Sequence, residues 1–131
     1  MNAHDGGMNV IGRLQTFVLD CPDPAALAGF YAELLGGKVV EEQDDDDTWV
    51  ELRGDFGTTV SFQRVDHYRP PMWPAQNQAQ QAHIDIGVDD LDAAQQQVLA
   101  LGALLLEDWG RGKSFRVFAD PAGHPFCLCQ E

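Results

Sequence analysis

The chain has 131 residues with 21 acidic and only 8 basic side chains, which gives a formal net charge of −13. Such a surface repels nucleic acid and anionic membranes, so both are excluded as expected partners. No apolar run reaches the roughly 20 residues needed to cross a bilayer. The chain carries three cysteines, an odd number, and its first residues show no secretory signal. We therefore expect a cytoplasmic protein with free thiols.

The first half of the chain predicts one strand, one helix and three further strands. The apolar run Leu14–Leu19 is typical of a strand. Asp23 is a suitable helix N-cap, and Pro24 suits the first helical turn, where no amide donor is needed. Apolar residues then recur at helical spacing until Gly36–Gly37 ends the helix. The strand candidates that follow are 38–42, 48–53 and 58–65.

The second half repeats this order after a segment of different composition. Residues 66–81 are rich in proline and glutamine and are expected to form a linker or a lid over a cavity. A strand is expected over 83–88, and either Asp89 or Asp90 caps a helix that ends at Gly102. The remaining strand candidates are 103–108, 114–119 and 125–130.

This internal repetition predicts the architecture. Repeated strand and helix order implies duplication of one supersecondary unit, here a βαβββ module. In one such module, the helix covers one face of the sheet and leaves the other face open. Two modules are therefore expected to lie side by side, so that the open face is covered or used. We predict an α+β fold in which two modules, about 13–65 and 82–131, form one cupped eight-stranded mixed sheet with helices on the outer face. Residues 1–12 are expected to form a flexible tail outside this domain.

Two segments carry a resemblance to a known family. The first is Ala82–Ala94, with the sequence AHIDIGVDDLDAA, and the second is Phe118–Phe126, with the sequence FADPAGHPF. Both resemble the vicinal-oxygen-chelate superfamily, which includes glyoxalase I, extradiol dioxygenases and antibiotic resistance proteins. Phe62–Val65 and Tyr68–Pro74 are similar to segments of small bacterial glyoxalase-like proteins. The resemblance covers nearly the whole chain and implies the two-module fold predicted above.

The resemblance also implies four positions at which metal-dependent members hold a divalent ion. Carried over to this chain, the positions are Gln15, Ser61, His83 and Cys127, where the family usually has His or Gln, Glu, His and Glu. Ser61 and Cys127 replace the carboxylates that hold hard ions. No metal cofactor is therefore favoured. A softer site in which His83 and a Cys127 thiolate hold a divalent ion (Zn, Ni, Mn or Fe) stays open as an alternative.

His83 and Cys127 also have simpler explanations. Histidines often line a cavity or form hydrogen bonds in a core, and a free cysteine often packs as a small buried apolar residue. A thiolate–imidazole nucleophile is a further hypothesis, because an adjacent base lowers a thiol pKa. The sequence indicates no third orienting group and no oxyanion hole, so we assign no catalytic residue.

The favoured function is metal-independent binding of an unidentified small molecule, as a sequestering or resistance-type protein. The alternative is a metal-dependent lyase or isomerase of glyoxalase type with an atypical metal site, and an interaction role for the fold is a third hypothesis. His67, which begins the loop with Tyr68 and Arg69, would reach a ligand if that loop folds over the cup. By resemblance, we expect a homodimer. The expected lining of the cavity is Gln15, Trp49, Ser61, Gln63, His83, Arg116 and Cys127.

Overall fold

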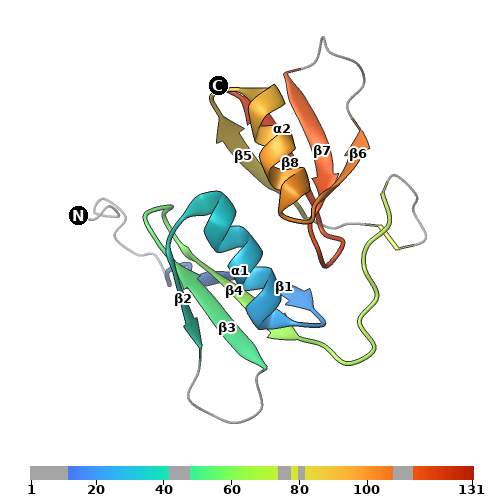
Figure 1. The fold of residues 1–131 in the computed structure, drawn as a ribbon. Helices are drawn as coiled ribbons and strands as arrows, with labels where there is room; N and C mark the ends of the chain where they lie inside the picture. Colours follow the sequence, from blue (N-terminus) through green and yellow to red (C-terminus); the bar gives the residue numbers. More distant parts are fainter. Residues whose placement is uncertain (1–11, 42–47, 74–77, 80–81, 108–113) are drawn as a thin grey trace.

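The computed structural model describes residues 12–41, 48–73, 78–79, 82–107 and 114–131 (Figure 1). The predicted tail, apart from Gly12, and part of the predicted linker lie outside the described residues. Module 1 contains β1 (Thr16–Cys21), α1 (Pro24–Leu35), β2 (Lys38–Glu41), β3 (Trp49–Arg53) and β4 (Thr59–Arg64). Module 2 contains β5 (Ile84–Val88), α2 (Leu91–Ala100), β6 (Leu104–Glu107), β7 (Phe115–Ala119) and β8 (Pro125–Gln130).

The two modules have the same sheet topology. The strand order is β1-β4-β3-β2 in the first sheet and β5-β8-β7-β6 in the second, and each first strand runs parallel to the last strand of its module. This confirms the α+β class and the two βαβββ modules. The eight strands form two four-stranded sheets, since every strand pairing among the described residues lies within one module. Side-chain packing, and not a shared strand pair, joins the modules.

Capping side chains explain where both helices begin. The Asp23 carboxylate accepts a hydrogen bond from the amide of Ala26 at 3.2 Å, and Asp90 does the same for Ala93 at 3.1 Å. Each cap satisfies an amide that has no partner within the helix. The structure thus selects Asp90, and not Asp89, as the second cap.

The two modules share one apolar core. In that core, Phe126 of β8 contacts Phe30 and Tyr31 of α1, with ring centroids 5.9 Å and 6.3 Å apart. Tyr31 also donates a hydrogen bond of 2.6 Å to Asp120, in the turn between β7 and β8. Helix α1 of the first module therefore packs against β8 of the second. Among the described residues, no helix is long and apolar enough to cross a membrane.

Strand alternation gives each sheet a packed face and an open face. Successive side chains of a strand point to opposite faces. Phe62 of β4 and Phe126 of β8 belong to the packed faces, where both are completely buried. Their strand neighbours Ser61 and Cys127 therefore belong to the open faces, which point away from the helices. The open faces hold the positions at which the family's metal ligands are expected.

Candidate functional site

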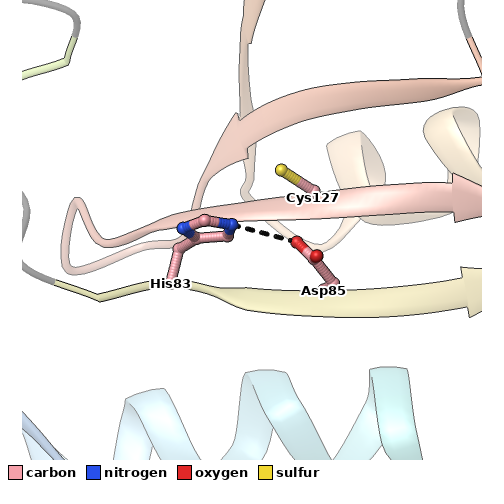
Figure 2. A group of neighbouring side chains, drawn as sticks. All are labelled: His83, Asp85 and Cys127. Atoms are coloured by element: carbon pink, nitrogen blue, oxygen red, sulfur yellow. Dashed lines mark ion pairs between the residues drawn. The ribbon is translucent and has the colours of Figure 1, made fainter.

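Three potential ligand side chains converge on the open face of module 2. His83 precedes β5, Asp85 lies on β5, and Asp85 stands opposite Cys127 of β8 in the parallel register. The two positions His83 and Asp85 share a face because they are two residues apart. Figure 2 shows the three side chains beside one another, with His83 and Asp85 directed toward each other. His83 Nε2 lies 3.1 Å from Asp85 Oδ1. All three potential donor atoms lie within 4.8 Å of one another.

Asp85 is the centre of this group. Its carboxylate contacts the His83 imidazole and accepts a hydrogen bond from the Cys127 thiol. Burial, followed by the negative charge and the hydrogen bond of Asp85, together raise the pKa of Cys127 to about 12. The thiol is therefore protonated near neutral pH. Because the imidazole pairs with Asp85 and the thiol pKa is high, the geometry does not support a thiolate–imidazole nucleophile.

Alkylation by iodoacetamide provides a test of this thiol. At pH 8 we expect Cys127 to react at least about 100-fold more slowly than in the unfolded chain, where a thiol pKa is about 8.5. The rate should keep rising beyond pH 10, because the thiolate fraction still grows there. Burial raises the folded pKa, so this thiol stabilises the fold fully below about pH 8.5, and the contribution is lost as the pH approaches 12.

Peptide mapping by mass spectrometry would follow each cysteine separately in that experiment. The free cysteines are Cys21, Cys127 and Cys129, and Cys129 is the more exposed of the two on β8. A Cys127 rate that levels off near pH 7 would indicate a thiolate at neutral pH and contradict the raised thiol pKa.

In module 1, the equivalent positions are Thr16 and Ser61. Val18 of β1 pairs with Ser61, just as Asp85 of β5 pairs with Cys127. Thr16 lies two residues before Val18, and His83 lies two residues before Asp85, so Thr16 corresponds to His83. The family resemblance implies Gln15 at this position, whereas the strand register places Thr16 there. Gln15 precedes β1 and is exposed, and its carbonyl oxygen accepts a hydrogen bond from Thr58 at 3.4 Å.

The module 1 positions hold a pair of neutral hydroxyls. Ser61 is completely buried, and its Oγ lies 2.5 Å from Thr16 Oγ1, which also donates to the carbonyl of Thr59 at 2.9 Å. Hydroxyls that are bonded to each other offer no negative charge to a cation. The four family positions therefore supply two hydroxyls, an imidazole and a thiol. This set does not fit a hard divalent ion shared between the modules.

A carboxylate near this pair is already engaged. Glu51 of β3 stands opposite Ser61, and its oxygens accept hydrogen bonds from Trp49 Nε1 at 3.0 Å and from Arg53 at 2.7 Å. The hydrogen bond from Trp49 lowers the pKa of Glu51, and Arg53 lowers it further. The charge of Glu51 is thus balanced by Arg53 on the same strand. Glu51 is not available to replace the carboxylate ligand that Ser61 lacks.

The other expected lining residues lie on different faces. Trp49 and Gln63 are paired in register and share the open face with Ser61. Arg116 points the other way, because it donates hydrogen bonds to Asp92 at 2.7 Å and to Gln95 at 2.9 Å on α2. It is 8% exposed and ties β7 to the helix. The structure therefore does not bring Arg116 together with Cys127.

A separate cavity of about 660 Å³ lies beside β1, where the linker and the β7–β8 turn meet it. This volume is typical of sites for small organic molecules. The cavity shares no residue with the lining expected from the sequence. Its wall is formed by Phe17, Val18, Leu19, Asp20, Tyr68, Arg69, Pro71, Gln78, Ala79, Ala82 and His124.

The linker is held against the second module at this cavity. His124 Nε2 lies 3.2 Å from the Tyr68 hydroxyl and 2.5 Å from the carbonyl oxygen of Asp20. Pro70 packs on Gly123, where an added Cβ would come 2.6 Å from the proline Cβ and where φ is +93°. Only glycine suits both the close approach and this backbone conformation. Tyr68 and Arg69, which the sequence placed on a loop over the cup, thus line a cavity.

Comparison with known proteins agrees with this architecture. A family model for the glyoxalase-like domain matches residues 16–129. The match spans well over half of the chain, and the chain therefore belongs to the glyoxalase-like domain family. Among curated protein sequences, none matches the chain.

Solved structures show the same fold. A glyoxalase/bleomycin resistance protein/dioxygenase family enzyme from Burkholderia phytofirmans PsJN has a TM-score of 0.69 and 16% identity, covering 91% of this chain and 98% of that chain. The trypanothione-dependent glyoxalase I of Leishmania major has a TM-score of 0.66 and 20% identity, covering 92% and 88%. A hypothetical protein from S. aureus has a TM-score of 0.65 and 21% identity, covering 94% and 100%. The family match, together with this shared fold, confirms the vicinal-oxygen-chelate resemblance.

Proposed function

We propose that this protein binds a small organic molecule with an acidic group in the cavity beside β1, without the help of a metal ion, as a sequestering protein. The observation that carries the proposal is the cavity itself, with its volume of about 660 Å³ and its mixture of apolar and polar walls. Phe17, Val18 and Leu19 supply the apolar wall. An apolar wall with a few oriented polar groups is the general form of a small-molecule site.

Arg69 gives the proposed ligand its chemical class. It is exposed, lines the cavity, and makes no ion pair with another described residue. A guanidinium binds a carboxylate through two parallel hydrogen bonds. Asp20 also lines the cavity, so the acidic group of a ligand would lie near Arg69 and away from Asp20. The apolar body would then cover the wall formed by β1.

The absence of a metal requirement rests on the pair of hydroxyls in module 1. Metal-dependent relatives need negatively charged ligands from both modules, and Thr16 and Ser61 supply none. Binding in the cavity depends instead on shape, apolar contact and Arg69. These interactions need no ion.

A thermal shift screen with aromatic carboxylates, such as naphthoate and indole acetate, tests this function. A compound present at 100 times its Kd stabilises the fold by about 2.7 kcal/mol, which raises the Tm by roughly 10 °C. In Arg69→Gln we expect the affinity for such a compound to fall by about 10-fold to 100-fold, because a charge-assisted hydrogen bond is lost.

Arg64→Gln is the matched control, since Arg64 is an exposed arginine at the end of β4 that does not line this cavity. It should bind the compound as the wild type does. The proposal fails if no aromatic carboxylate shifts the Tm, or if Arg69→Gln and Arg64→Gln bind equally well.

A metal-dependent lyase or isomerase is the second candidate function. It is favoured by one observation, the convergence of His83, Asp85 and Cys127 on the open face of module 2. If the protein is a metal-dependent enzyme, removal of the metal abolishes both turnover and ligand binding. If it is a metal-independent binding protein, ligand binding survives removal of the metal. The homodimer and the cytoplasmic location stay predictions.

A further inference from the structure

We propose that His83, Asp85 and Cys127 form a binding site for a borderline-soft divalent cation, Zn²⁺, held entirely within module 2. This site differs from the four-position site of the family's metal enzymes, because it uses no residue of module 1 and adds the carboxylate of Asp85 on β5. It is also separate from the cavity beside β1, whose wall contains none of the three residues. The proposal does not depend on the proposed ligand-binding function.

The geometry supplies three donors around one point. Asp85 and Cys127 are opposite each other on adjacent strands, and His83 precedes Asp85 on the same face, so the backbone of two paired strands fixes all three. Their donor atoms lie within 4.8 Å of one another. Bonds of about 2.0–2.3 Å to a tetrahedral zinc ion place its ligands roughly 3.5 Å apart. A side-chain shift of about 1 Å would bring the three donor atoms to this ligand separation.

The types of donor favour zinc over hard ions. An imidazole nitrogen, a thiolate sulfur and one carboxylate oxygen match the ligands that zinc prefers, whereas magnesium and calcium prefer oxygen alone. The His83 and Asp85 side chains are 40% and 62% exposed, which leaves room for a water molecule as a fourth ligand. Asp85 already contacts both neighbours, so a cation takes the place of the proton that the thiol shares with the carboxylate.

The surroundings add negative charge. The Glu131 side chain lies over Gly87, where an added Cβ would meet its carboxylate group. Gly87 follows Asp85 by two residues and shares its face. Asp85 and Glu131 are thus two carboxylates near the site, in a chain whose net charge is −13. An anionic environment of this kind attracts a dication.

Titration with Co²⁺, a spectroscopic substitute for zinc, tests the site. Metal-stripped, reduced protein should bind one equivalent of Co²⁺ and develop a sulfur-to-cobalt charge-transfer band in the near ultraviolet, which Zn²⁺ then removes by displacement. Cys127→Ser should lose the band. Cys129→Ser is the matched control, because Cys129 lies on the same face of β8 and outside the three-residue group, and it should keep the band.

The Asp85→Asn variant provides a second test of the site that stays valid if Cys127→Ser disturbs the core. Asp85 is exposed, so its replacement should leave the fold intact. Its apparent Kd for Co²⁺ should rise by more than about 10-fold, since even residues that only orient a metal ligand contribute that much. The site is disproved if the wild type shows no charge-transfer band, if the band is lost in Cys129→Ser but kept in Cys127→Ser, or if Asp85→Asn binds Co²⁺ as the wild type does. No organic ligand is present in this titration, so its outcome is independent of the cavity.

Discussion

Replacing Phe126 by alanine is expected to lower the free energy of unfolding by about 4 kcal/mol. The ring is completely buried and contacts Phe30, Tyr31 and Phe118, with centroid separations of 5.9, 6.3 and 5.6 Å. Its removal leaves a cavity between α1 and the second sheet. Because Phe126 belongs to module 2 while Phe30 and Tyr31 belong to module 1, the loss affects both modules.

Urea unfolding measures the size of this effect, and amide hydrogen exchange measures its spread. In Phe126→Ala, amides of β4 in module 1 should exchange faster to the same extent as amides of β8 in module 2. This follows if the modules unfold as one cooperative unit around a shared core. Ala93→Gly provides a control substitution on an exposed position of α2, with an expected cost of about 1 kcal/mol. Faster exchange confined to module 2 would contradict the shared core.

Replacing Asp120 by alanine should cost about 3 kcal/mol, which corresponds to a fall of roughly 10 °C in Tm. Asp120 is 3% exposed and accepts hydrogen bonds from the Tyr31 hydroxyl at 2.6 Å and from the amides of Ala122 and His124 at 2.8 and 3.0 Å. Alanine leaves these buried donors without an acceptor. The same turn forms part of the cavity through His124, so ligand binding should weaken as well.

A double-mutant cycle with Tyr31→Phe isolates one bond of this network. The coupling free energy between the two substitutions should be about 1–2 kcal/mol. Without the Tyr31 hydroxyl, replacing Asp120 leaves one buried donor fewer without an acceptor. Asp89→Ala is the matched control, because Asp89 is an exposed aspartate beside a helix cap, and its effect should stay within about 0.5 kcal/mol. A cost below about 1 kcal/mol for Asp120→Ala would show that the turn does not need its carboxylate.

Most of the fold follows from local chemistry that a sequence displays. Asp23 and Pro24 predict the start of α1 because only certain side chains satisfy or dispense with the first helix amides. The glycine at position 36, with a φ of +80°, predicts its end. Alternation and apolar runs predict the strands to within two residues of the observed bounds. The division into two sheets is not visible in this way, because it depends on how α1 packs against a distant strand.

The site is only partly predictable because it depends on which face each strand residue occupies. His83 and Cys127 were predicted to lie together, and the strand register places them on one face. Asp85 was missed, although strand alternation from His83 places it there. Gln15 was predicted where the structure places Thr16. The spacing from Thr16 to the Asp23 cap equals the spacing from His83 to the Asp90 cap, so the sequence does contain this signal.

Contacts between distant segments account for the remaining differences. Arg116 has the charge expected of a ligand-binding residue, yet Asp92 and Gln95 of α2 hold it on the packed face. The cavity beside β1 forms because the linker crosses to the β7–β8 turn, where Pro70 meets Gly123. Such contacts join residues between 21 and 53 positions apart. No local pattern encodes them.

Small-molecule binding in the cavity is proposed to need no metal, whereas the three-residue group of module 2 is proposed to bind one separately. The most direct measurement is the Tm shift caused by an aromatic carboxylate in EDTA-treated protein and in the same protein with one equivalent of Zn²⁺. We predict an equal shift in both samples, and in Asp85→Asn, but a smaller one in Arg69→Gln. A shift that disappears in EDTA and returns with Zn²⁺ would contradict the claim and favour a metal-dependent enzyme.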